Sequence, residues 1–262
     1  MGSVPIEEGP ALVGADGRRV SVLAVWHDPG GELPPALEVV REDRDAVEVV
    51  LRRRRRSVLP PGAAVPLVLI GPRTVTGTLP DPLRGRRLVD SATGREVPCF
   101  HAYRLAQVTW LPDGYRFETD AHPHTLRGGP FPPEVLAWSR VYITRTPIRG
   151  FTHEIRIVQA LGRGLTTLGP GWTPSGTVPV GAHEASAYDD LEPGTARPTA
   201  RAVSWSSATN SYLVRTGLRG RLPEPEDIWA QPVLPPAVLE DVPAHATLLR
   251  VARGLREPTR DR

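Results

Sequence analysis

The sequence predicts an α+β fold that is mainly β, with an N-terminal antiparallel barrel or sandwich and a loop-rich second half that ends in a helix. Three observations carry this prediction. The 30 prolines and 25 glycines are spread along all 262 residues, where they shorten helices and mark turns. Between these turns lie short runs of β-branched and aromatic residues, as is typical of strands. Near the C-terminus, apolar residues recur at helical spacing.

The N-terminal part contains the first predicted strands. Residues 20–26, VSVLAVW, are apolar and β-branched, and HDPGG follows them as a turn. Residues 37–41 and 46–51 are two more strands on either side of the charged turn EDRD. In the second of these, Val47, Val49 and Leu51 share one face and Glu48 lies on the other, so this strand has one face towards a core.

Two β-hairpins are predicted from turn composition. Residues 102–110, AYRLAQVTW, and residues 115–119, YRFET, flank the turn LPDG. Residues 200–218 form the second hairpin, with SSATNS as its turn. Residues 153–161, HEIRIVQAL, fit a helix or a strand equally, because Ile155, Val158 and Leu161 recur at helical spacing while the run itself is β-branched.

The second half is predicted to be richer in loops. Gly, Pro, Ser and Thr dominate residues 166–199, which indicates long loops around one or two short strands. The stretch HATLLRVARGLR has an apolar side and ends in arginines, as expected of a helix C-terminus. A boundary within residues 122–132, HPHTLRGGPFP, predicts a β-rich region at 1–124 and a mixed region at 125–262; a single domain is the alternative.

Composition excludes several kinds of chemistry. All 32 basic residues are arginines, so no lysine is present to form a Schiff base, act as a general base or serve as the phosphate-binding lysine of a P-loop. Cys99 is the only cysteine, which rules out an internal disulfide and a cysteine-rich zinc site, and we expect it to be an ordinary buried thiol. A net charge of +3 does not indicate nucleic-acid binding. Without a signal-peptide pattern or a long apolar run, the expected location is the cytoplasm, with no membrane contact.

One short stretch, ETDAHPH at residues 118–124, concentrates groups that bind metals. On a strand, His122 and His124 point to the same face about 6–7 Å apart, which suits two ligands of one divalent transition metal. Glu118 shares that face, and His183 is the preferred further ligand, with His101 and His153 as alternatives. The competing interpretation is a polar strand end that runs into a solvated loop.

The densest charge in the chain is a run of five arginines. Arg52, Arg53, Arg54, Arg55 and Arg56 are adjacent, so on a strand they occupy both faces. One hypothesis is anion binding, because arginine holds the phosphate of a nucleotide through a bidentate fork. The alternative is an exposed edge strand that its charge keeps soluble.

Three functions remain open from the sequence, and whether the protein is an enzyme is left undecided. The first is an interaction or assembly module with a protein partner or a second copy of itself; it is favoured by scattered tryptophans, long Pro/Gly loops and the lack of catalytic motifs. The second is a metal-dependent β-barrel enzyme that uses the His-x-His pair. The third is binding of a nucleotide or phosphate by the arginine run.

Overall fold

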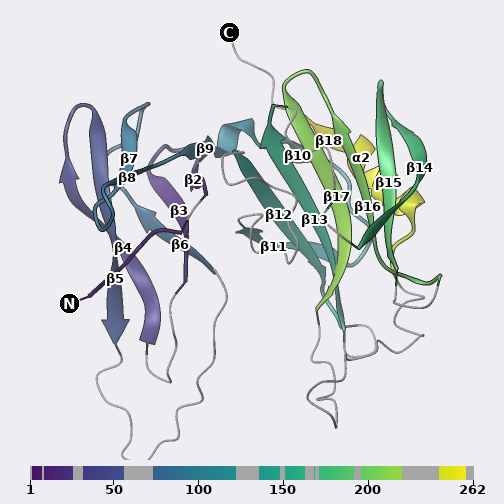
Figure 1. Ribbon diagram of the computed structural model, residues 1–262, viewed down its shortest axis with the longest axis horizontal. Coiled ribbons are helices and arrows are strands. Elements are labelled where there is room, and N and C mark those ends of the chain that lie inside the picture. The colour runs from purple at the N-terminus through teal and green to yellow at the C-terminus, as the bar shows by residue number, and fades with distance from the viewer. Residues whose placement is uncertain are drawn as a thin grey trace, which may run out of the picture. The chain divides into compact units, whose positions relative to one another are not determined.

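Two compact units make up the chain. Unit 1 comprises Met1–Leu105, Ala121–Arg127 and Phe131–Trp138, and unit 2 comprises Ala106–Asp120, Gly128–Pro130 and Ser139–Arg262. The computed structural model describes residues 2–7, 9–25, 32–55, 73–121, 136–147, 151–162, 168, 171–191, 196–219 and 242–257 (Figure 1). The boundary predicted between residues 124 and 125 lies outside these ranges. The structure is mainly β, as predicted.

Unit 1 is built from two sheets. The first contains β1 (Ser3–Val4), β5 (Ala46–Arg55), β7 (Arg87–Asp90) and β8 (Arg95–Val97) in that order, with β4 (Glu32–Glu42) also paired to β5. The second has the order β6 (Arg73–Thr78), β3 (Arg19–Ala24), β2 (Ala11–Val13) and β9 (Cys99–His101), and the 3-10 helix η1 (Ala102–Arg104) follows it. Buried side chains of both sheets form one apolar cluster, which makes unit 1 a sandwich.

The predicted strands of unit 1 are confirmed where the structure describes them. β3 covers most of residues 20–26, and β4 and β5 form the hairpin predicted around EDRD. Val47, Val49 and Leu51 are all fully buried, as their alternation with Glu48 requires. Gly77 on β6 is explained by close packing between strands. A Cβ at this position would lie 2.6 Å from Leu37 Cβ, so only glycine lets β6 approach β4.

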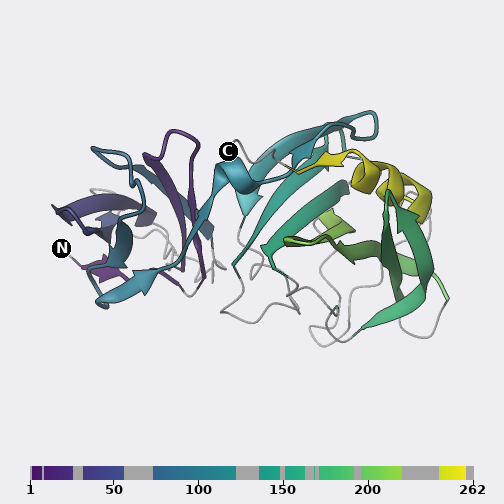
Figure 2. The ribbon, with the colours of Figure 1, turned by 90° about the horizontal axis from the view of Figure 1, so that it is seen from above.

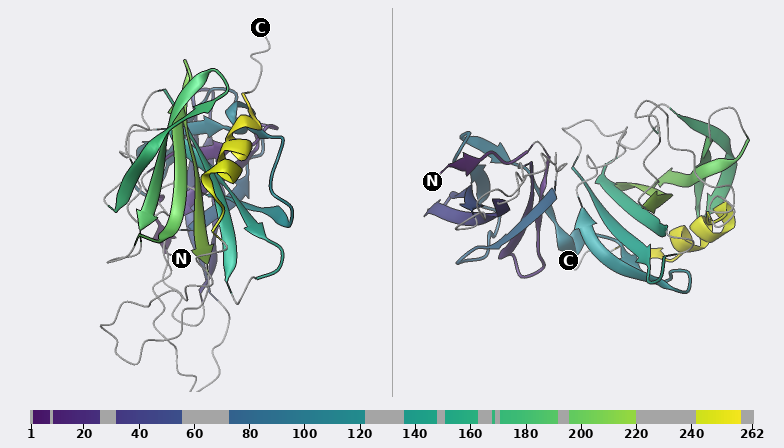
Figure 3. Two further views of the ribbon diagram at one scale, coloured as in Figure 1. Left: turned by 90° about the vertical axis from the view of Figure 1, so that its right-hand side faces the viewer. Right: turned by 90° about the horizontal axis from the view of Figure 1, so that it is seen from below.

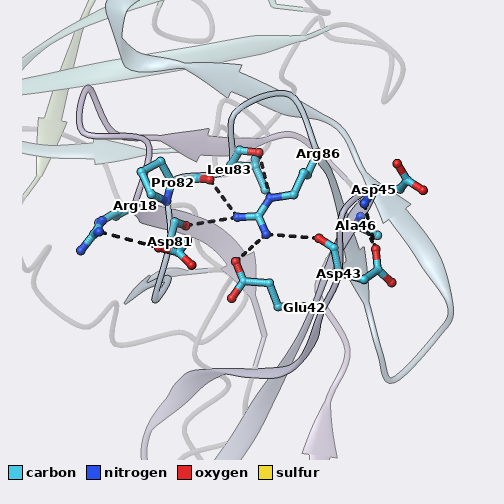
Figure 4. Close-up of polar contacts among 9 residues, drawn as sticks. All are labelled: Arg18, Glu42, Asp43, Asp45, Ala46, Asp81, Pro82, Leu83 and Arg86. Carbon is cyan, nitrogen blue, oxygen red and sulfur yellow. Dashed lines mark hydrogen bonds and ion pairs between the residues drawn. The ribbon is translucent and has the colours of Figure 1, made fainter.

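Arg86 holds two turns of unit 1 together (Figure 4). Its side chain is 15 % exposed and its guanidinium donates to the Glu42 carboxylate. It also donates to four backbone carbonyls, those of Asp43, Asp81, Pro82 and Leu83. This arginine therefore joins the β4–β5 turn to the segment before β7, and its charge is fully used within the fold.

Unit 2 is built on one seven-stranded sheet. Its order is β11 (Tyr115–Ala121), β12 (Ala137–Thr144), β13 (Thr152–Leu161), β17 (Asn210–Arg219), β16 (Pro198–Ser206), β15 (His183–Leu191) and β14 (Trp172–Val180). The helix α2 (His245–Arg253) packs against this sheet through Leu248, Val251 and Ala252, and β10 (Gln107–Val108) pairs with β18 (Leu255–Arg256). The sheet curls as a half-barrel, with α2 on its inner side (Figures 2 and 3).

The structure confirms two predictions for unit 2 and settles a third. β16 and β17 form the hairpin predicted at residues 200–218, and α2 is the predicted C-terminal helix. Residues 153–161 belong to strand β13 and not to a helix. Both faces of β13 are buried, which explains why its sequence shows a run of apolar residues without the alternation of a half-exposed strand.

One other prediction for unit 2 was wrong, and a second underestimated the length of two strands. The segment 102–110 does not form a hairpin with β11, because Gln107 and Val108 pair instead with β18 from the far end of the chain. Residues 166–199 contain two strands, within the one or two short strands predicted there, but β14 and β15 are longer than expected, with nine residues each. β14 is an edge strand whose middle is exposed, so Gly, Pro, Ser and Thr are tolerated there.

Within the described ranges, no helix is both long enough and apolar enough to cross a membrane.

Candidate interaction edge

The predicted metal ligands lie only partly within the described structure. His122 and His124 fall outside the described residues. Glu118 is exposed on β11 and His183 is exposed at the start of β15, and four strands separate β11 from β15 in the sheet. The described residues contain no group of three or more His, Cys, Asp or Glu side chains that could hold a metal ion. The His-x-His site therefore stays a prediction.

The two alternative histidines occupy different surroundings. His153 on β13 is 1 % exposed. His101 stacks on Tyr103 with 5.2 Å between ring centroids, and burial together with the charge of Arg104 lowers its pKa. A lowered pKa favours the neutral imidazole at neutral pH, which is the form that binds metals.

Part of the arginine run is described, on strand β5. Arg52 pairs with Ser3 of β1 on one side and with Ala36 of β4 on the other. The run therefore does not start on an edge strand, contrary to the edge-strand alternative considered from the sequence. The Arg52 side chain lies 3.5 Å from the Glu38 carboxylate. The side chains of Arg53 and Arg54 are exposed, whereas the Arg55 side chain and Arg56 are outside the described residues. Anion binding here stays a prediction.

Cys99 has the character of an inert thiol. Burial, with a smaller contribution from Glu96, raises its pKa to about 12. The thiolate is the reactive form, so this residue is a poor nucleophile at neutral pH.

Among the strands that the structure describes, β11 lies at one edge of the unit 2 sheet, and it carries a prominent exposed aromatic residue. Phe117 is 52 % exposed, and its ring meets Tyr142 of β12 edge-on at 5.8 Å between centroids. Tyr115, on the same face by the period of two, packs partly against the core of unit 2. β11 is therefore anchored at Tyr115 and projects Phe117 into solvent.

The backbone of β11 shows which hydrogen-bonding groups face the open edge. Arg145 N–H, just after β12, donates to Gly114 C=O at 2.9 Å. The Tyr115 N–H belongs to the same peptide unit as the Gly114 C=O and points to the opposite side, away from β12, because the C=O and N–H of a trans peptide point in opposite directions. Along a strand, the N–H and C=O groups of alternate residues share a side. Tyr115, Phe117 and Thr119 therefore direct their backbone groups outwards.

The other face of β11 alternates in charge around Phe117. Arg116 and Glu118 are both exposed and flank Phe117 symmetrically. In an antiparallel pairing of this strand with itself, centred on Phe117, each Arg116 lies opposite a Glu118. The edge is therefore complementary to a second copy of itself.

The opposite edge of the same sheet, β14, lacks these features. It contains Pro174 and Pro179, which have no N–H to donate, and its register to β15 shifts between Pro174 and Gly176. Such prolines and bulges prevent edge-to-edge pairing. Of the two edge strands, β11 therefore has the residues that favour pairing with another strand.

The sequence contained this information in a form that pattern analysis missed. The run YRFET was interpreted as half of a hairpin, and Glu118 as a metal ligand. The sheet order is needed to place β11 at an edge. At an edge, the opposite charges on either side of Phe117 favour pairing with a second copy of the strand.

Comparisons with known proteins give no match to this chain among protein-family models, curated proteins or solved structures.

Proposed function

We propose that the protein is an assembly module whose copies associate through strand β11. Two β11 strands would pair antiparallel about a two-fold axis at Phe117 and join the two unit 2 sheets. The observation that carries this proposal is the self-complementary edge: an exposed Phe117 between Arg116 and Glu118, on a strand without proline. A two-fold contact of this kind is closed, so it yields a dimer.

The pairing assigns a role to each group on the edge. The Phe117 N–H would donate to the C=O of the partner's Phe117, and the Phe117 C=O would accept the reciprocal bond from the partner's Phe117 N–H. These are the two central hydrogen bonds of the dimer; the Tyr115 N–H already donates to Pro112 C=O at 3.3 Å. Arg116 would meet the partner's Glu118 at a non-hydrogen-bonded position, where facing side chains come closest.

The strength of this contact should be modest. A five-residue edge buries less surface than the ~1,000 Å² in total that a stable interface usually needs. We therefore expect a dissociation constant of roughly 1–100 µM, equivalent to about 5.5 to 8 kcal/mol. Association would then depend on the local concentration of the protein, as in an assembly that gathers many copies.

Charge reversal provides the test. Arg116→Glu places glutamates opposite glutamates in both symmetric pairs, and Glu118→Arg places arginines opposite arginines. Each single variant should weaken dimerisation about 5- to 100-fold, because cross-strand charge pairs contribute roughly 0.2–1 kcal/mol and like pairs cost a similar amount. The double variant restores opposite charges and should dimerise like the wild type. Sedimentation velocity over a concentration series measures all four proteins.

A matched control separates this register from a general charge effect. Glu184→Arg reverses an exposed glutamate on β15 of the same unit and should leave the dissociation constant unchanged. A wild-type protein that stays monomeric at about 1 mM would refute the proposal. So would a double variant that remains as weak as the single variants, since only the antiparallel register predicts rescue.

A further inference from the structure

Unit 2 contains a pocket that is unrelated to the β11 edge. It has a volume of about 220 Å³. The pocket lies where the turn between β14 and β15 meets the end of α2, and Trp205, Tyr212, His183, Leu255, Arg253 and Glu257 are among its lining residues. This volume lies between the ~150 Å³ of a cavity that holds benzene and the ~300 Å³ at which drug-sized sites begin. It suits a compact organic molecule.

Two stacked aromatic rings contribute to the pocket wall. Trp205 and Tyr212 face each other across β16 and β17, with 5.1 Å between centroids and 21° between ring planes. Trp205 is 7 % exposed and Tyr212 is 2 % exposed, so these rings are fixed by packing. Aromatic rings fixed in this way attract the alkyl part of a ligand and also a positive charge over a ring face.

A carboxylate lies beside these rings. Tyr212 O–H donates to Glu257 Oε1 at 2.9 Å. Side-chain hydrogen bonds from Ser207, Tyr212 and Asn210 lower the Glu257 pKa against the opposing effect of burial, and the charge of His183 acts in the same direction. The three hydrogen-bond donors are neutral groups, so they position the carboxylate and keep it ionised without cancelling its charge.

The polar framework behind Glu257 extends into the sheet. Gln159 Nε2 donates to Asn210 Oδ1 at 3.2 Å, and Gln159 Oε1 accepts the Ala106 N–H at 2.7 Å. Asn210 and Gln159 are both buried. Glu257 itself is exposed, but Asn210, one of the groups that hold its carboxylate, is fixed by this buried network.

Arg253 is the remaining charged group in the lining. It lies in the last turn of α2, and its Nη2 donates to Pro179 C=O at 3.0 Å. Its other guanidinium nitrogens offer further donors, which could hold a ligand carboxylate.

We propose that this pocket binds a small organic molecule that carries an ammonium group, with Glu257 as the counter-ion and Trp205 and Tyr212 as the apolar wall. A plain alkylamine and a free amino acid share this chemistry. Only the amino acid also has a carboxylate, which would bind to Arg253. The proposal is independent of the pairing through β11.

Calorimetric titration with three probes tests the site: n-butylammonium, L-leucine and butyrate. We expect saturable binding of at least one ammonium probe and none of butyrate. Glu257→Gln should weaken that binding about 10- to 100-fold, the range for loss of a charge-assisted contact. Glu96→Gln, an exposed change in unit 1, is the matched control and should bind like the wild type. Arg253→Gln should weaken L-leucine alone if the ligand is an amino acid.

Three results would overturn the proposal. They are butyrate binding as tightly as the ammonium probes, unchanged binding in Glu257→Gln, and no saturable binding of either ammonium probe to the wild type at about 10 mM. If Glu257→Gln does not fold, the pH dependence of the wild type replaces it. Binding should persist as pH falls below the ordinary glutamate value of 4.5 and disappear only when Glu257 becomes protonated, because its pKa is lowered.

Discussion

The two edge strands of the unit 2 sheet, β14 and β11, differ in whether their residues permit pairing with a further strand. β14 carries Pro174 and Pro179 and a register shift, whereas β11 has no proline and presents an exposed Phe117 between opposite charges. Both edges belong to the same sheet and face the same solvent. The difference therefore reflects residue choice at each edge and not the fold, since an edge strand is a template for association unless something blocks it.

This difference also shows that exposure alone does not define an interaction surface. β14 is more exposed along its middle than most strands of the sheet, yet its side chains there are small and polar. β11 combines an anchored residue, Tyr115, with an exposed one, Phe117. An edge that is fixed on one side and open on the other can pair without first becoming ordered, which lowers the entropic cost of association.

The largest effect should come from making β11 resemble β14. Phe117→Pro removes an N–H that faces the open edge, so the ladder with β12 is preserved while both central hydrogen bonds of the dimer are lost. Together with the loss of the facing rings this amounts to about 3 kcal/mol, and the dissociation constant should rise at least ~100-fold. Sedimentation velocity measures this change.

Two companion variants isolate the cause. Phe117→Ala keeps the N–H and loses only the ring, so its effect should be smaller, roughly tenfold. Arg116→Pro removes an N–H that faces β12, so it should lower the thermal stability of unit 2 itself. If Phe117→Pro dimerised like the wild type, or if it lowered stability as much as Arg116→Pro, the assignment of outward-facing groups would be wrong.

The reverse change, making β14 resemble β11, should have a smaller effect. Pro174→Thr with Pro179→Thr returns two N–H groups to β14. It is best made in the Arg116→Glu background, where pairing through β11 is weakened. We expect new self-association with a dissociation constant of roughly 0.1–1 mM, because β14 lacks an exposed aromatic residue and charge complementarity. Light scattering over a concentration series detects it. An unchanged monomer would show that features other than the prolines protect β14.

Much of the fold could be predicted because its local patterns agree with its tertiary structure. The alternation of Val47, Val49 and Leu51 gave the β4–β5 hairpin, and the apolar side of 245–253 gave α2. The failures arose where pairing is long-range. Val108 pairs with Leu255, nearly the whole of unit 2 away in sequence, and nothing in the residues around LPDG reveals that partner.

The candidate surfaces were harder to predict for a related reason. The pocket brings together His183, Trp205, Tyr212 and Glu257 from four separate segments, and only His183 had been singled out, for a metal. The edge at β11 lies within a stretch that did attract attention for another reason: Glu118 was grouped with His122 and His124 that follow it, a grouping that stays a prediction, whereas the proposed pairing of two β11 strands involves Arg116 two residues earlier.

The smallest of the predicted effects concerns how β11 is anchored. Burial raises the Tyr115 pKa from its ordinary value of 10 to about 12. Above pH 10 the phenol of the unfolded chain ionises, while that of the folded chain stays neutral until about pH 12. The stabilisation is therefore complete below pH 10 and is lost as pH rises through 12. Tyr115→Phe cannot ionise, so the difference in unfolding free energy between wild type and variant should shift in favour of the variant across this window.

Urea unfolding of the two proteins at pH 8, 10 and 11.5 measures this difference, and contributions from the other tyrosines cancel in the comparison. The pH 8 values, where Tyr115 is neutral in both states, supply the baseline. A difference that stays constant from pH 8 to pH 11.5 would mean that Tyr115 is solvated and β11 is not anchored there. β11 would then be no more fixed than the exposed middle of β14, and its advantage for pairing would rest on Phe117 and the two charges alone.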